Sequence, residues 1–256
     1  MGFKSVCKIW DDVLDETLDE RQAPEIDEVI TGSAHKVYSD SKEFYNRTYV
    51  SSSMKEVLMN IVKVLTGQGG NNILVLYSLF GGGKTHTLIA IHHGFKEPDA
   101  LAVQDSKLAS EIRKVSRRRT VIIFGKNNSF SSSPSQPLSF KTYKVHTVWG
   151  YLAHCLGRFE EVKVNDRNLT VPSVDTLRRV LGSEPTIILI DEIVDYGVNY
   201  LNSKDVAEKK YAQNLPLFLD RLATAAIGTN TVIVVTFPIK VSGRKVQIER
   251  VEARYT

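Results

Sequence analysis

The sequence predicts an α/β fold in which helices cover both faces of a mostly parallel sheet. Four short apolar runs, each typical of a buried strand, alternate along the chain with segments in which apolar residues recur at helical spacing. Strands that alternate with helices form parallel sheets, because each strand needs a crossover before the next one can run in the same direction. The chain has 256 residues, 42% of them hydrophobic and 24% charged, which is enough for one such domain with a substantial core.

The order of the elements follows from these runs. The predicted strands cover residues 72–77, 120–124, 186–192 and 231–237. The predicted helices cover residues 51–67, 84–95, 98–119, 146–159, 173–182 and 215–228, so that one helix separates the last two strands. Ser51 offers an N-cap for the first of these helices, and Gly67 is typical of its end. We expect a turn-rich connection at residues 31–49 and a mobile polar loop at residues 126–139.

Uneven charge divides the chain into three predicted parts. Residues 10–28 contain nine acidic residues against one arginine, which favours an exposed acidic arm and connector over residues 1–50. Residues 51–238 hold the strands and helices of the core, and residues 239–256 form a basic tail. The alternating residues of that tail suit a fifth strand.

A glycine-rich loop follows the first predicted strand and precedes a predicted helix. Residues 77–88 read YSLFGGGKTHTL, which matches the phosphate-binding pattern G-x-x-x-x-G-K-[ST] except that Ser78 replaces the first glycine. A small serine suits that position, because the three glycines that follow keep backbone freedom where the loop wraps the phosphate. A glycine-rich turn with a chance GKT is the alternative interpretation. The residues predicted to bind nucleotide are Ser78, Leu79, Phe80, Gly81, Gly82, Gly83, Lys84, Thr85 and His86.

Two residues of this loop carry its predicted chemistry. The helix that follows directs its N-terminal amides at a bound anion. Lys84 is expected to bridge the β- and γ-phosphates of ATP and to act in catalysis, and the Thr85 hydroxyl is expected to bind Mg²⁺.

A pair of acidic residues ends the third predicted strand. Asp191 and Glu192 close the run PTIILIDE, about a hundred residues after the glycine loop. In nucleotide hydrolases with such a loop, the aspartate sits beside the first strand and holds Mg²⁺ through water, so we assign Asp191 to the metal. The glutamate after it is placed to polarise the attacking water, which makes Glu192 the predicted catalytic base. Two acids that merely cap a strand are the alternative for this pair alone.

The acid pair also separates classes of P-loop protein. Small-molecule P-loop kinases need no hydrolytic glutamate at this position, whereas additional-strand ATPases do. The final predicted strand ends in Thr236, where such ATPases place a polar sensor that helps to position the water. Thr236 is therefore the third predicted catalytic residue, although threonine is also common in strands for other reasons.

Four segments together resemble a known family. They are FYNRTYVSS, LFGGGKTHTLIAIHH, HTVWGYLAHCLG and IILIDEIVDYG. They look like the N-terminal ATPase region of large prokaryotic AAA+-like proteins catalogued as a domain of unknown function. The likeness runs from about residue 28 to residue 238, and the order of the motifs matches. The glycine loop and the TVWG segment are its more specific parts.

The resemblance implies a P-loop ATPase of the additional-strand type that uses ATP and Mg²⁺. It also implies that residues 48–50 border the adenine. Members are often associated with DNA methylase and helicase-like partners, which implies a role in restriction or defence against foreign DNA. Family members are longer, and the arginine finger and helical lid of an AAA+ module cannot be read in this chain. The alternative is therefore a nucleotide-dependent switch or scaffold that binds ATP with little hydrolysis.

Charge and composition indicate which partners the chain can bind and in which cellular compartment we expect it. Lys114 and Arg117 to Arg119 belong to a basic patch at residues 113–119 that is a candidate DNA contact, although a solvated helix end is the simpler interpretation. A homo-oligomer is plausible, because AAA+ sites usually lie between subunits. No apolar run is long enough to span a membrane, and we expect a cytoplasmic protein with its two cysteines reduced.

Overall fold

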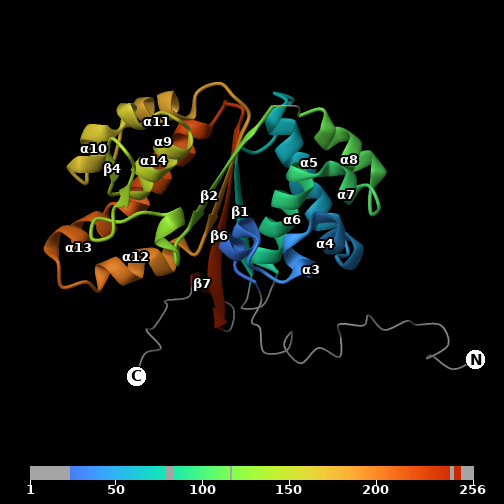
Figure 1. Cartoon of the computed structure of the whole chain (residues 1–256), viewed down its shortest axis with the longest axis horizontal. Coiled ribbons are helices and arrows are strands. Elements are labelled where there is room, and N and C mark those ends of the chain that lie inside the picture. Colours follow the sequence, from blue (N-terminus) through green and yellow to red (C-terminus); the bar gives the residue numbers. More distant parts are fainter. Residues whose placement is uncertain (1–23, 79–82, 116, 243–244, 249–256) are drawn as a thin grey trace, which may run out of the picture.

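The chain folds into three layers, with a sheet between two layers of helices. A computed structural model describes residues 24–78, 83–115, 117–242 and 245–248. Figure 1 shows the sheet nearly edge-on, with the helices from α3 to α8 on one side and those from α9 to α14 on the other. This arrangement confirms the predicted α/β class with a mostly parallel sheet flanked by helices. In the described part of the chain, no helix is both long enough and apolar enough to cross a bilayer.

Four parallel strands form the centre of the sheet. They are β1 (Ile73–Ser78), β2 (Arg119–Phe124), β5 (Thr186–Asp191) and β6 (Thr231–Ser242), and their spatial order is β1-β6-β5-β2. The expectation that Asp191 would lie on the strand beside β1 was wrong, because β6 pairs with both β1 and β5 and separates them. Thr236, in the middle of β6, consequently lies between β1 and the strand that carries the acid pair.

Alternating side chains of these strands fill two separate cores. Ile187 and Leu189 of β5 pack into the core beneath helices α5, α6 and α8. Ile188 and Ile190, which point the opposite way, pack into the core beneath α9, α11 and α14. All six residues of β5 are buried, as expected for a strand covered on both faces, and this explains why its four central residues are all apolar.

The first helical layer is built from residues before β2. Its helices are α2 (Ile26–Thr31), α3 (Lys36–Ser39), α4 (Ser41–Arg47), α5 (Ser52–Leu65), α6 (Lys84–Lys96), α7 (Pro98–Leu101) and α8 (Ser106–Arg113). The predicted turn-rich connection at 31–49 therefore holds two short helices, and Phe44 and Tyr45 of α4 are buried in the core. The single helix predicted at 98–119 is two helices, because Asp105 caps a new one by accepting a hydrogen bond from the backbone N–H of Leu108 at 3.0 Å.

The second helical layer follows β2. Its helices are α9 (Val148–Cys155), α10 (Lys163–Arg167), α11 (Val174–Leu181), α12 (Ile193–Leu201), α13 (Val206–Gln213) and α14 (Leu215–Ala226), with 3₁₀ turns η3 (Asn128–Phe130) and η4 (Phe159–Glu161). Three helices rather than the predicted one thus separate β5 from β6. The first two of them, α12 and α13, pack against each other. No helix was predicted for either segment.

The loop that was predicted to be mobile is held against this layer. Ser131, Ser132 and Ser133 are buried, with exposed fractions of 1%, 0% and 0%. The Ser132 hydroxyl donates to the carbonyl of Val145, and its own carbonyl accepts from the Tyr196 hydroxyl of α12. A small antiparallel pair, β3 (Leu138–Ser139) with β4 (Lys144–Val145), completes the segment. Serine is polar, but its small side chain can be buried when its hydroxyl has a backbone partner.

The basic tail begins with a strand, as its alternation suggested, but not with a fifth parallel strand of the central sheet. Strand β7 (Lys245–Ile248) pairs antiparallel with the end of β6, with Ile239 opposite Ile248. Figure 1 shows this pair of strands extending beyond the rest of the sheet.

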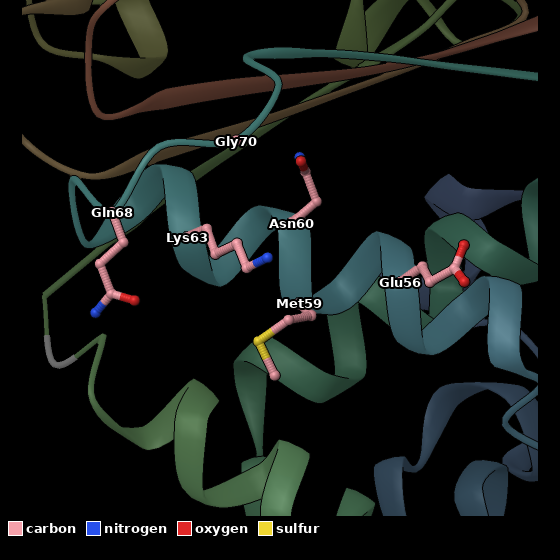
Figure 2. A pocket seen from close by; sticks show the side chains of 6 residues that line it. All are labelled: Glu56, Met59, Asn60, Lys63, Gln68 and Gly70. Carbon is pink, nitrogen blue, oxygen red and sulfur yellow. The ribbon is translucent and has the colours of Figure 1, made fainter.

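A surface pocket lies at the opposite end of β1. It has a volume of about 400 Å³ and is lined by Glu56, Met59, Asn60, Lys63, Gln68 and Gly70 (Figure 2). The Asn60 side chain is already engaged, since its amide bonds the backbone N–H and C=O of Asn71, both at 2.9 Å. Ligands of open α/β sheets bind at the carboxyl ends of the strands, so this pocket beside the amino end of β1 is not the expected nucleotide site.

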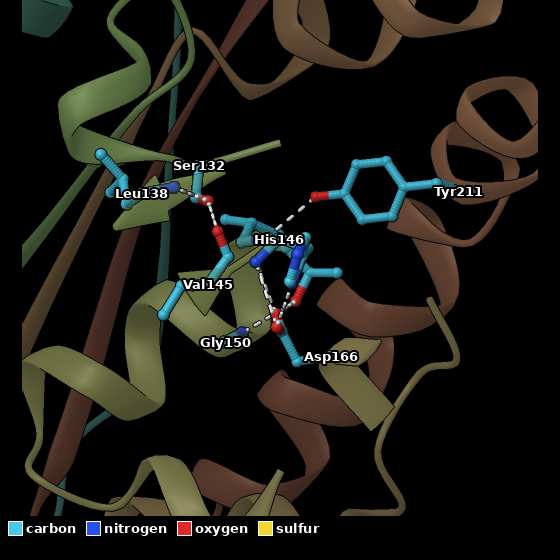
Figure 3. A network of polar contacts seen from close by, with 9 residues as sticks. Ser132, Leu138, Val145, His146, Gly150, Asp166 and Tyr211 are labelled. Carbon is cyan, nitrogen blue, oxygen red and sulfur yellow. Dashed lines mark hydrogen bonds and ion pairs between the residues drawn. The ribbon is translucent and has the colours of Figure 1, made fainter. Parts of the chain in front are cut away.

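The HTVWG segment is held in place by hydrogen bonds to one buried carboxylate (Figure 3). Asp166 is 1% exposed. It accepts hydrogen bonds from the backbone N–H of His146 at 3.0 Å, from the His146 ring at 3.0 Å and from the Thr147 hydroxyl at 2.6 Å. The Thr147 hydroxyl in turn caps α9 by accepting from the backbone N–H of Gly150 at 3.0 Å. Trp149 is fully buried against the rings of Tyr211 and Phe218. The segment thus joins α9 to α10 and α13.

We predict that Gly150→Ala destabilises the fold by about 2–4 kcal/mol, because an overpacked core and broken buried hydrogen bonds add their costs. A Cβ on Gly150 would lie 2.1 Å from the Asp166 Oδ1, so the carboxylate would have to leave its donors. The free energy of unfolding in urea measures the effect. Gly197→Ala in α12 is the matched control, because its Cβ would lie 3.4 Å from Leu215 and alanine favours a helix interior. Equal stability of the two variants would contradict this account.

Candidate functional site

The described part of the glycine loop leads directly into a helix. Strand β1 ends at Ser78, and α6 begins at Lys84 after Gly83, whose backbone is left-handed with φ of 74°. Lys84, Thr85 and His86 therefore occupy the first turn of a 13-residue helix, as predicted. The predicted nucleotide-binding residues Leu79, Phe80, Gly81 and Gly82 lie outside the described residues.

The carboxylate of Asp191 is the centre of the site. It ends β5 and is 2% exposed. Its Oδ2 accepts a hydrogen bond from the Thr85 hydroxyl at 3.1 Å. Its Oδ1 accepts from the Thr236 hydroxyl and from the backbone N–H of Glu192, the latter at 3.1 Å. Three predicted site residues that are far apart in the sequence, Thr85, Asp191 and Thr236, are thus in direct contact.

The strand order explains this contact. Thr236 lies on β6 between β1, which leads to Thr85, and β5, which carries Asp191. The part of β6 that pairs with β1 ends at Pro238, opposite Ser78, so Thr236 lies near the carboxyl edge of the parallel sheet, where all three side chains meet. Hydroxyl and carboxylate oxygens are the ligands that Mg²⁺ prefers, usually with several waters and phosphate oxygens as the remaining ligands. Among the residues that the structure describes, no three His, Cys, Asp or Glu side chains are grouped as ligands of a metal held by protein alone.

Glu192 has an unusual backbone. It precedes α12 with φ of 54°, in the left-handed region that non-glycine residues seldom adopt. Its carbonyl lies against Gly125, where a Cβ would be 2.0 Å from the Glu192 oxygen. Strained backbone of this kind is often found at functional sites.

The Glu192 side chain lies among other charges. Its Oε1 is 3.6 Å from the Nζ of Lys126. Burial, with a smaller contribution from a hydrogen bond to Asp195, raises the pKa of Glu192 to about 7, and the positive charge of Lys126 opposes this rise. A carboxyl group with a pKa near neutrality is suited to exchange protons at the pH of a cell.

Sequence reasoning missed Gly125 and Lys126. Both follow β2, whose last residue, Phe124, pairs with Asp191. The backbone N–H of Gly125 donates to the carbonyl of Asp191 at 3.0 Å. Residues that follow adjacent parallel strands share one edge of the sheet. Assigning Gly125 and Lys126 to the site therefore required the strand order, which the sequence alone did not provide.

The segment predicted to border adenine lies beside the start of α6. The Thr48 hydroxyl is 3.2 Å from the His86 Nε2, and Thr48 is buried. Its neighbour Tyr49 is 83% exposed. Farther along the same helix, the fully buried His93 bonds Ser41 at 2.9 Å and the carbonyl of Tyr38 at 2.7 Å. The histidines of α6 thus fasten the N-terminal helices to the helix that follows the glycine loop.

The basic patch is largely matched by intramolecular partners. Its ion pairs are Arg113 with Asp99, Lys114 with Glu111, and Arg119 with Glu184. The Arg118 guanidinium donates to the carbonyl of Val115 at 2.8 Å, and it lies over the Phe95 ring. These contacts agree with the simpler interpretation of the patch as a helix end. DNA binding by residues 113–119 stays a prediction.

We predict that Thr236→Val lowers the free energy of unfolding by about 1–3 kcal/mol, the cost of removing a hydrogen-bond donor from a buried polar group. Valine keeps the shape of threonine but leaves the Asp191 Oδ1 with one donor fewer. Thr236→Ser keeps the hydroxyl and is the control, for which a smaller loss is expected. A larger loss in the serine variant would show that the methyl group, not the hydroxyl, stabilises this strand end. Urea denaturation measures both.

Comparison with family models identifies a family for this chain. The family model described as the DUF499 N-terminal domain matches residues 1–256. No curated protein matches the chain significantly. Because the model covers the chain from end to end, this protein belongs to the DUF499 N-terminal domain family, a domain of unknown function.

Proposed function

We propose that this chain binds ATP with Mg²⁺ at the carboxyl edge of its sheet and hydrolyses the γ-phosphate. The observation that carries the proposal is the contact of Thr85 and Thr236 with the buried Asp191. In a chance glycine turn, nothing would require a threonine of the following helix to meet an acid that lies about a hundred residues away.

The start of α6 supplies the phosphate site. The first turn of a helix has unpaired backbone N–H groups and the positive end of the helix dipole, both of which attract anions. Lys84, at the first position of this helix, adds a positive charge for the β- and γ-phosphates. The described backbone of Ser78 and Gly83 is consistent with a loop that begins at the strand and ends at the helix.

The donor set around Asp191 fits Mg²⁺. The Thr85 hydroxyl and the Asp191 carboxylate would hold the ion, directly or through water, and the ion would neutralise charge on the phosphates. Thr236 keeps the carboxylate turned toward Thr85, since it occupies the other carboxylate oxygen.

Glu192 is the proposed general base. It follows the metal-binding aspartate directly and is partly shielded from water, so its carboxylate can accept a proton from the attacking water. The backbone at Glu192 is left-handed, so the chain turns into α12 directly after Asp191.

The strand order supports the additional-strand type of P-loop fold. Strand β6, which carries Thr236, is an additional strand between the loop strand β1 and the acid strand β5. This agrees with the AAA+-like resemblance of the sequence. Predicted partners are DNA, or a DNA methylase or helicase-like protein, and restriction or defence is the predicted setting.

We predict that Lys84→Ala weakens ATP binding about 100-fold and that Glu192→Gln keeps binding but lowers turnover about 100-fold or more. Calorimetry measures binding, and release of inorganic phosphate measures turnover. Lys96→Ala, an exposed lysine at the other end of α6, is the control and should match the parent chain.

The same assay distinguishes the alternatives. Turnover that is unaffected by Glu192→Gln would refute its role as the base. ATP binding without turnover in the parent chain would favour a nucleotide-dependent switch. Turnover that increases when double-stranded DNA is added would support a DNA-linked role, and absence of ATP binding would refute the proposal as a whole.

A further inference from the structure

A short hairpin on the second helical layer carries an exposed aromatic ring. Strands β3 and β4 are joined by a tight turn at Lys141 and Thr142, which the backbone N–H of Phe140 closes by donating to the carbonyl of Tyr143 at 2.9 Å. The Phe140 side chain is 36% exposed. A single exposed apolar side chain is common on protein surfaces, so the surroundings of this ring decide what it can do.

The Phe140 ring is held in place by a cluster of rings, which we call the aromatic ledge (Phe140, Tyr143, His154 and Phe159). Phe140 stacks on His154 of α9, with ring centroids 3.7 Å apart and planes inclined by 24°. Tyr143 stacks on Phe159 of η4, with centroids 4.3 Å apart and planes inclined by 10°. The Tyr143 hydroxyl is hydrogen-bonded to the His154 Nδ1 at 2.7 Å, which joins the two stacks. Because its neighbours already fix the Phe140 ring, a ligand that stacks on it does not have to order it.

Two lysines of the hairpin add positive charge beside the ledge. Lys141 lies in the turn, and Lys144 lies opposite Ser139 in the strand pair. Both lysines are exposed, and within the described part of the chain neither of them forms an ion pair. Surface cations without an ionic partner attract phosphate groups.

The acidic residues next to the ledge are paired with other cations. Glu160 and Glu161 follow Phe159 directly. The Glu160 Oε1 is 3.2 Å from the Nζ of Lys163, and the Glu161 Oε2 is 2.7 Å from the Nε of Arg179. Their negative charges are therefore matched by these two cations and do not offset those of the hairpin lysines.

The ledge lies away from the candidate nucleotide site. The Arg119 guanidinium, at the start of β2, donates to the carbonyl of Leu156, just after α9, at 3.4 Å. The end of α9, which carries His154, is thus beside the amino edge of the sheet, whereas Asp191 ends β5 at the carboxyl edge. Binding at the ledge consequently does not depend on the proposed ATPase function.

We propose that the aromatic ledge and the two hairpin lysines bind single-stranded nucleic acid. One base stacks on the exposed side of the Phe140 ring, and neighbouring phosphates pair with Lys141 and Lys144. A single strand offers both groups at once, because its bases have free faces and each nucleotide carries a negative charge. A duplex keeps its bases stacked on one another, and an acidic peptide offers charge without flat rings, so neither suits the ring and the lysines together.

The test is the binding of fluorescent oligothymidylate and oligouridylate of about 15 nucleotides, measured by fluorescence anisotropy without ATP. We expect Phe140→Leu, which keeps an apolar side chain but has no ring, to weaken binding about 5- to 150-fold with unchanged salt dependence. Phe140→Tyr keeps the ring and should stay within about twofold of the parent chain. The tighter of the two oligonucleotides shows whether DNA or RNA is the preferred ligand.

The lysines are tested through the salt dependence of binding. Lys141→Gln combined with Lys144→Gln should reduce the steepness of log affinity against log salt concentration by about 1.4, because each phosphate contact on a single strand contributes about 0.7. The matched control is Lys36→Gln combined with Lys107→Gln. It removes the same charge from exposed positions of α3 and α8, across the sheet, and should leave affinity within about twofold of the parent chain.

Four results would overturn the inference. They are absence of binding to either oligonucleotide, equal affinity of the parent chain and a folded Phe140→Leu variant, equal losses in the two lysine pairs, and equal affinity for a duplex and a single strand. Thermal unfolding shows whether Phe140→Leu keeps the fold. If it does not, the lysine variants decide the question, since their side chains are exposed and their removal leaves the ring cluster intact. Because no ATP is present, none of these results bears on the proposed ATPase function.

Discussion

The buried carboxylate of Asp191 is the constraint on which the candidate site depends. A charge removed from water is costly unless hydrogen bonds replace its hydration, and Asp191 obtains three donors from three separate segments. Those segments are the helix after the glycine loop, the middle of β6 and the residue that precedes α12. Satisfying one acid thus fixes the relative positions of the elements that phosphate binding, metal binding and proton transfer would require.

Asp166 holds elements of the second helical layer together, as Asp191 holds together the elements at the edge of the sheet. Its carboxylate is equally buried and takes its donors from His146 and Thr147, which begin α9. Gly150 is needed because the carboxylate occupies the space of a side chain. The most specific residues of a segment can therefore be structural, since the contacts described above for the HTVWG run are with Asp166, Tyr211 and Phe218.

The sequence was informative where the physical signal is local. Apolar runs located all four parallel strands, and the GKT sequence located the start of α6, because strand burial and loop chemistry are encoded within a few residues. The sequence was uninformative about strand order. Strand β6 lies between β1 and β5 because of long crossover connections, which no short stretch of sequence reveals. The contact of Thr236 with Asp191 depends on that order. Short polar helices such as α3 and α4 were missed because their hydrogen-bonded caps resemble turns.

The same dependence on strand order brings the N-terminal helix to the site. Adjacent parallel strands end side by side, so the residues after β2 must lie beside those after β5. Gly125 is required there because the Glu192 carbonyl leaves no room for a Cβ. The next residue, Lys126, places its Nζ 3.6 Å from the Glu192 Oε1. Once α2 packs against that corner through Asp27 and Asn127, a residue of the acidic N-terminal region contacts the same lysine as Glu192. Residues of the N-terminal region thus contact the edge of the sheet at which the candidate site lies.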